Sequence, residues 1–101
     1  MPDGDPKHLA AALGGQPVEP LSDAERVERE RVRNLVQSVA SCYNSLVSRT
    51  TDSVRRAEFA ERLAFHDAEL RRLPAMPAAE RRTIISTYPA LLARLRAELD
   101  G

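Results

Sequence analysis

The chain has little of what many small proteins depend on. Its 101 residues include one cysteine, Cys42, no tryptophan and four aromatic residues, and its 15 basic and 15 acidic side chains give a formal net charge of zero. A lone cysteine excludes an internal disulfide and fits a reducing cytoplasm. Zero net charge argues against a nucleic-acid partner, because the long-range attraction to a polyanion is missing.

Glycine and strong metal ligands are also scarce. Gly101 is the only glycine after residue 15, so we expect no phosphate-binding glycine loop. His8, His66 and Cys42 are the strong nitrogen and sulfur ligands, and they lack the spacing of a metal site, so neither a metal nor a cofactor is expected. No apolar run approaches the roughly 18 residues of a membrane span, and residues 9–15 are too short for a secretory signal. These absences predict a cytoplasmic protein with no membrane contact.

The residues that are present predict a tail followed by helices. Residues 1–21 hold four of the seven prolines and three of the four glycines, which predicts a flexible tail ahead of a single helical domain over 22–101. Ser22 and Glu25 form a capping-box pattern, and the apolar spacing that follows predicts a first helix from Ser22 to about Arg49. A polar cluster ends it, and a second helix is expected from Asp52 to about Leu73.

Prolines divide the rest of the chain. Pro74 and Pro77 end the second helix, and Pro77 is expected at the first position of a third. Pro89 either splits that third segment or kinks it. The apolar phase continues across Pro89, which favours one kinked helix. The predicted fold is all-α: an antiparallel helical hairpin plus a third, proline-broken helix.

The length of the first helix suggests a second copy of the chain. It should be roughly 40 Å long, whereas a compact domain of this size is roughly 30 Å across. We therefore expect its apolar stripe, from Val32 to Leu46, to be only partly covered by the later helices, and a homodimer to cover the rest.

His66 is the main candidate for chemistry. Apolar residues recur at intervals of three and four along the second helix, and His66 stands at the one position of this series that is not apolar. Arg62 lies four residues before it and Glu69 three residues after it. These three could form the polar edge of a groove, with Glu69 orienting the imidazole and Arg62 fixing an anion. Alternatively, the ring packs in the core and bonds Glu69 or a backbone carbonyl. With a turn near residue 51, Cys42 lies roughly 9 Å from His66 along the helix axis, and Tyr43 is also too distant within one hairpin.

Residues 59–99, FAERLAFHDAELRRLPAMPAAERRTIISTYPALLARLRAEL, carry a resemblance. In size, helical content and richness in Arg and Ala, the chain resembles the small actinobacterial maturation proteins that form the lysinoalanine bridge of duramycin- and cinnamycin-type lanthipeptides. The resemblance implies a small helical homodimer without a cofactor. It also implies a natural-product enzyme that holds a modified peptide while a lysine amine adds to a dehydroalanine.

Three functions follow. The first is a helical binding module that holds a peptide or protein segment in an apolar groove at a homodimer interface. The second is the cofactor-free cyclising enzyme of the resemblance, and the third is a regulatory helical dimer. In the first two, His66 and Glu69 are the candidate catalytic or polar-specificity residues, and the substrate-binding candidates are Arg62, Tyr43, Phe59, Phe65, Leu70 and Tyr88.

Overall fold

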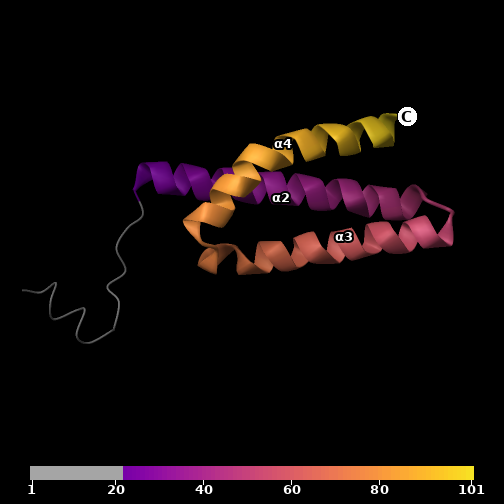
Figure 1. The fold of residues 1–101 in the computed structure, drawn as a ribbon, viewed down its shortest axis with the longest axis horizontal. Coiled ribbons are helices and arrows are strands. Elements are labelled where there is room, and N and C mark those ends of the chain that lie inside the picture. Colours follow the sequence, from indigo (N-terminus) through magenta and orange to yellow (C-terminus); the bar gives the residue numbers. More distant parts are fainter. Residues whose placement is uncertain (1–21) are drawn as a thin grey trace, which may run out of the picture.

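The computed structural model describes residues 22–101, and the predicted tail, 1–21, lies outside the described residues. Three helices make up the described part, α2 (Asp23–Arg49), α3 (Ser53–Arg72) and α4 (Ala78–Asp100), with a 3-10 turn, η1 (Leu73–Ala75), between α3 and α4. Within 22–101 there is no strand. Helices α2 and α3 run antiparallel side by side, and α4 crosses α2 (Figure 1). The all-α prediction of a hairpin and a third helix is confirmed.

The first two helices begin at the predicted caps. The Ser22 hydroxyl accepts a hydrogen bond from the Glu25 amide at 3.1 Å, and the Glu25 carboxylate accepts one from the Ser22 amide, also at 3.1 Å. The bond from the Ser22 amide is the largest cause that holds the pKa of Glu25 below its usual value. Asp52 caps α3 by accepting from the amides of Val54 and Arg55. Both helix starts follow from local sequence.

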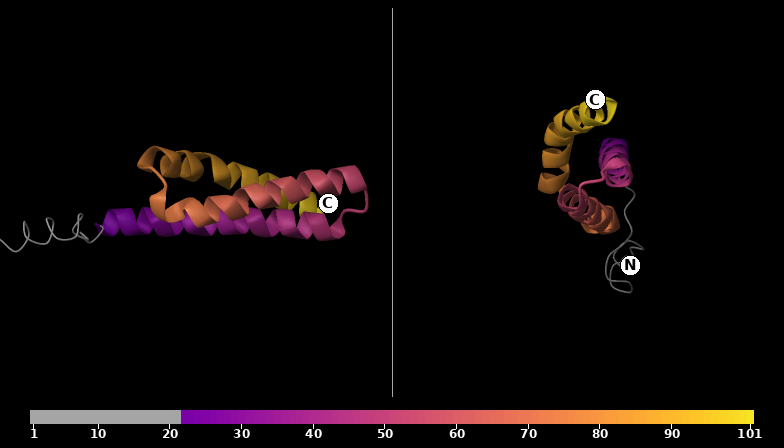
Figure 2. Two further views of the ribbon diagram at one scale, coloured as in Figure 1. Left: turned by 90° about the horizontal axis from the view of Figure 1, so that it is seen from below. Right: turned by 90° about the vertical axis from the view of Figure 1, so that its right-hand side faces the viewer.

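The proline-containing segments differ from the prediction in one detail. Pro77 is the N-cap of α4, not its first helical residue: its backbone is extended, and its carbonyl accepts the first helical bond, from the Arg81 amide at 3.1 Å. Pro89 lies inside α4, which continues as one helix to Asp100. The prediction of one helix in preference to two is therefore confirmed. The helix curves along its length (Figure 2), as expected where a proline removes a backbone donor.

Helix α2 provides the centre of the core. Val32, Val36 and Val39 are completely buried, because α3 and α4 both pack on α2. Two groups of buried side chains continue this core, one around Val39 and Tyr43 and the other around Val32 and Ile84. The expectation that the α2 stripe needs a second chain to cover it is wrong, since the two later helices bury it within one chain. Homodimerisation itself stays a prediction.

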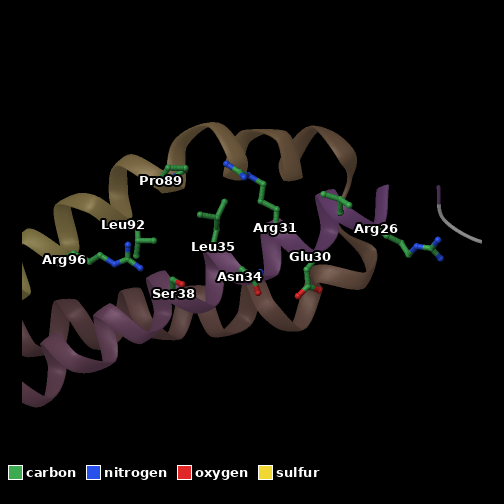
Figure 3. A pocket seen from close by; sticks show the side chains of 10 residues that line it. Arg26, Glu30, Arg31, Asn34, Leu35, Ser38, Pro89, Leu92 and Arg96 are labelled. Carbon is green, nitrogen blue, oxygen red and sulfur yellow. The ribbon is translucent and has the colours of Figure 1, made fainter. Parts of the chain in front are cut away.

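An open groove runs between α2 and α4, with Pro89 on its wall (Figure 3). It is one of two hollows that, together with a buried cluster of polar side chains, make up the candidate functional site.

Candidate functional site

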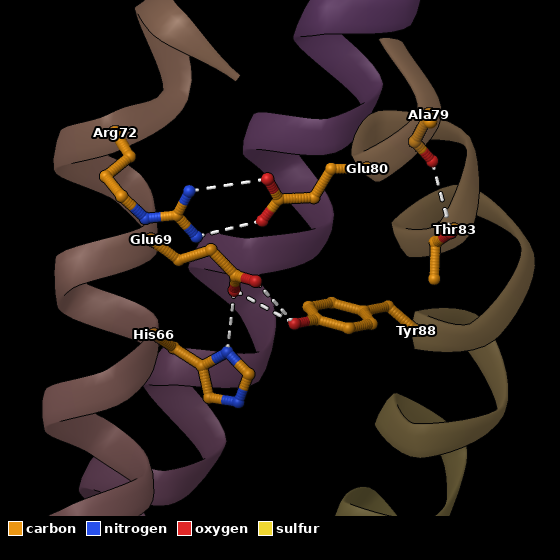
Figure 4. A network of polar contacts seen from close by, with 7 residues as sticks. All are labelled: His66, Glu69, Arg72, Ala79, Glu80, Thr83 and Tyr88. Atoms are coloured by element: carbon orange, nitrogen blue, oxygen red, sulfur yellow. Dashed lines mark hydrogen bonds and ion pairs between the residues drawn. The ribbon is translucent and has the colours of Figure 1, made fainter. Parts of the chain in front are cut away.

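Three predicted site residues meet in the interior. His66 and Glu69 of α3 and Tyr88 of α4 form a hydrogen-bonded cluster, called here the buried network, that joins the two helices in front of α2 (Figure 4). His66 and Glu69 are only 4% and 3% exposed. Both side chains face inward because His66 occupies a position in the apolar series of α3, and Glu69, about one helical turn later, lies on the same face.

Glu69 is the acceptor on which the network depends. His66 Nδ1 lies 2.8 Å from Glu69 Oε1, and the Tyr88 hydroxyl lies 2.9 and 2.7 Å from the two carboxylate oxygens. With Glu69 ionised, His66 and Tyr88 both donate to it, which offsets the cost of burying the carboxylate. Burial raises the pKa of Tyr88 above its usual range, and the bond to Glu69 raises it further. The predicted hydrogen bond between the imidazole and Glu69 is present.

Aromatic rings surround the imidazole of His66. The Tyr43 ring stacks on it, with centroids 5.6 Å apart and planes 9° from parallel. The rings of Phe65 and Tyr88 meet it edge-on at 5.0 and 5.5 Å. The sequence placed Tyr43 too far from His66 within one hairpin for a hydrogen bond. No such bond forms within residues 22–101, but the two rings are in contact, so the estimated separation was too large. Side chains tilt toward the N-terminus of their own helix, and in an antiparallel pair this tilt brings Tyr43 and His66 toward each other.

Arg62 does not join His66 and Glu69 in an exposed polar edge. It is exposed, whereas the other two face the core. Arg62 lines an open pocket of about 690 Å³, called here the α3 pocket, with three other predicted binding residues and two carboxylates: Tyr43, Phe59, Phe65, Glu58 and Glu61. Tyr43 and Phe65 touch both this pocket and the imidazole of His66. The structure therefore brings seven of the eight predicted site residues into two adjoining groups.

Leu70 and Cys42 lie apart from these groups. Leu70 is half-buried and packs against the cluster around Val32 and Val36. Cys42 is buried among Val39, Leu46 and their neighbours, as expected for a small packed residue.

The groove between α2 and α4, called here the α2–α4 groove, has a volume of about 840 Å³. Leu35, Leu92 and Pro89 lie along it, with Arg31 and Arg96 at either side of them (Figure 3). Its remaining lining residues are Arg26, Val27, Glu30, Asn34 and Ser38. Sequence reasoning missed this groove, because its walls come from helices distant in sequence. The available signals were Leu35, which lies beside the main stripe of α2, and the proline within α4.

Within residues 22–101, five arginines form ion pairs, and Arg31 and Arg96 are among those that do not. The sequence has three arginine doublets, 55–56, 71–72 and 81–82. Each contributes one member to an ion pair with another segment: Arg55 with Glu98 at 2.6 Å, Arg72 with Glu80 at 2.9 Å and Arg81 with Glu28 at 2.8 Å. Arg81 is buried and also donates to the Met76 carbonyl. Arg31 and Arg96 form no ion pair with any residue in 22–101.

Comparison with protein-family models, curated proteins and solved structures finds no match for this chain.

Two further findings concern the described part of the chain. Residues 22–101 contain no group of three or more His, Cys, Asp or Glu side chains placed to hold a metal ion. None of the helices α2 to α4 has the length and apolar character needed to cross a membrane.

Proposed function

We propose that the protein is a helical binding module that takes an amphipathic, acidic helix of a partner protein into the α2–α4 groove. One observation carries the proposal: an apolar strip of Leu35, Leu92 and Pro89 lies between two arginines that have no acidic partner in the described chain. The volume of about 840 Å³ is within the usual range for a ligand site.

Charge complementarity selects the occupant. Among the charged residues of the groove, Arg26 is paired with Asp23 at 2.7 Å and Glu30 with Arg33 at 3.1 Å. Arg31 and Arg96 thus supply the uncompensated charge. A helix that places leucine-like side chains on the strip and carboxylates beside it would satisfy both, in the helix-in-groove manner.

A pair of designed peptides tests the proposal. Each is a fluorescein-labelled helix with Leu at i, i+3, i+4 and i+7, and the flanking residues are Glu in one and Lys in the other. Fluorescence anisotropy with the full chain should show about tenfold tighter binding of the Glu peptide, which is about 1.4 kcal/mol.

Two double variants locate the binding. Arg31→Glu with Arg96→Glu should weaken binding of the Glu peptide about tenfold. Arg82→Glu with Arg94→Glu makes the same change in net charge at two exposed α4 residues that do not line the groove, and should weaken it less than about twofold. Equal losses in both would contradict a specific groove, as would unchanged binding of a peptide with Ser in place of Leu.

Homodimerisation is a separate hypothesis. A second copy of the chain would be a competing occupant of the groove, and the regulatory-dimer alternative depends on it as well. Sedimentation velocity at micromolar concentration tests the homodimer and the regulatory dimer together. A monomer would contradict both and leave the proposal of a bound partner helix intact.

The cyclising-enzyme hypothesis receives less support from the geometry. A general base must come within hydrogen-bond reach of the proton that it removes, whereas His66 and Glu69 are almost fully buried and bonded to each other. The lining of the α3 pocket includes neither residue, although it includes Tyr43 and Phe65, whose rings contact the imidazole.

A further inference from the structure

The α3 pocket combines aromatic rings with carboxylates. Tyr43, Phe59 and Phe65 supply three rings, and Glu58 and Glu61 supply two carboxylates. Phe65 is 56% exposed, which is unusual for so large an apolar side chain in a small protein. Aromatic faces carry negative charge density, so rings and carboxylates both attract an organic cation.

Two features of the pocket residues favour a ligand over internal pairing. The carboxylates of Glu58 and Glu61 form no ion pair or hydrogen bond with any other residue of 22–101, although Glu58 stands four residues before Arg62. Tyr43 is almost fully buried, but its hydroxyl has no hydrogen-bond partner among the described residues and is not fully enclosed, so it is open to a ligand. A ligand with N–H donors would supply partners for all three groups.

The chain itself shows a cation on one of these rings. The guanidinium carbon of Arg55 lies 5.0 Å from the centroid of the Phe59 ring. Arg55 does not line the pocket and is drawn toward Glu98 at 2.6 Å. The contact demonstrates that a guanidinium fits on this aromatic cluster without closing the pocket.

We infer that the α3 pocket binds a guanidinium or alkylammonium group, presented as the arginine or lysine side chain of a peptide. The cation would lie against the exposed ring of Phe65, with Glu58 and Glu61 as its counter-charges and the Tyr43 oxygen as an acceptor. Arg62, the one basic residue of the lining, opposes this binding and leaves the pocket with one net negative charge. The α3 pocket and the α2–α4 groove share no residue, so the two proposals succeed or fail separately.

The small number of aromatic residues makes an NMR test direct. The chain has two Phe and two Tyr, and three of the four line the pocket, while Tyr88 belongs to the buried network and serves as an internal control. The full chain, with labelled aromatic residues, is titrated with N-acetyl-arginine methylamide, N-acetyl-lysine methylamide and the neutral isostere N-acetyl-citrulline methylamide. The two cations should shift the signals of Tyr43, Phe59 and Phe65 more than those of Tyr88, and citrulline should not. Citrulline binding as well as arginine would overturn the inference.

Variants of exposed residues give the second readout. Glu58→Gln with Glu61→Gln should weaken arginine binding about fivefold, and Arg62→Gln should strengthen it about threefold. Asp67→Asn with Asp100→Asn, a matched loss of two charges outside the pocket, should change it less than about twofold. Equal losses in the two double variants, or weaker binding in Arg62→Gln, would overturn the site. Binding of methylguanidinium without binding of the acetylated arginine would overturn the peptide source.

Discussion

The buried network and the α2–α4 groove treat charge in opposite ways, although α4 contributes to both. In the network, the His66 imidazole and the Tyr88 hydroxyl are both paired with the Glu69 carboxylate, and His66 and Glu69 are almost fully buried. In the groove, Arg31 and Arg96 flank an apolar strip and have no acidic partner in residues 22–101. The difference teaches that charges satisfied within the chain hold helices together, whereas unsatisfied charges beside apolar surface are available to a ligand.

The sharpest way to break the comparison is to remove the central acceptor. Glu69→Ala leaves the His66 and Tyr88 donors unpaired in the interior, so we expect a loss of about 3 kcal/mol in the free energy of unfolding. Urea denaturation measures it. Glu61→Ala, on the exposed side of the same helix, is the control and should cost less than about 0.5 kcal/mol. Similar losses in the two variants would show that the network contributes nothing beyond an ordinary surface carboxylate.

A smaller effect separates packing from hydrogen bonding at His66. His66→Phe keeps an aromatic ring beside Tyr43 but removes one donor to Glu69, and should lower the free energy of unfolding by about 1 to 2 kcal/mol. His66→Gln keeps a donor and loses the ring stack, so it isolates the other contribution. A Phe variant at least as stable as the parent would mean that His66 only packs.

Alkaline pH tests the Tyr88 end of the network. The pKa of Tyr88 is raised in the folded chain from an ordinary value of 10.0, mainly by burial. The unfolded chain therefore loses this proton first, so stability is fully present below about pH 10 and falls as the pH rises above it. Urea titrations from about pH 8 to 11 should show this decline in the parent. Tyr88→Phe should be about 1 kcal/mol less stable at neutral pH and decline less at high pH. A parallel decline in Tyr88→Phe would assign the effect to other groups.

Local sequence predicted the helices well and the site in part. Ser22, Asp52 and Pro74 act through neighbouring backbone atoms, so the helix boundaries could be inferred within one or two residues. The bond between His66 and Glu69 followed from their spacing on one helix. The contacts of Glu69 with Tyr88 and of Tyr43 with His66 depend on how separate helices meet, and no local pattern specifies that. The α2–α4 groove was missed for the same reason, because its shape depends on the path of α4 beyond Pro89.

The smallest expected effect sharpens the other side of the comparison. Arg31→Gln with Arg96→Gln removes two arginines that have no acidic partner in the described chain, so the free energy of unfolding should change by less than about 0.5 kcal/mol. The same double variant should bind the Glu-flanked peptide about fivefold more weakly, because a ligand is the partner that these guanidiniums lack. Urea denaturation and fluorescence anisotropy on one preparation measure both quantities. A stability loss comparable to that of Glu69→Ala would show that the two arginines stabilise the fold through contacts within the chain. The groove would then have no cationic group left to select an acidic helix.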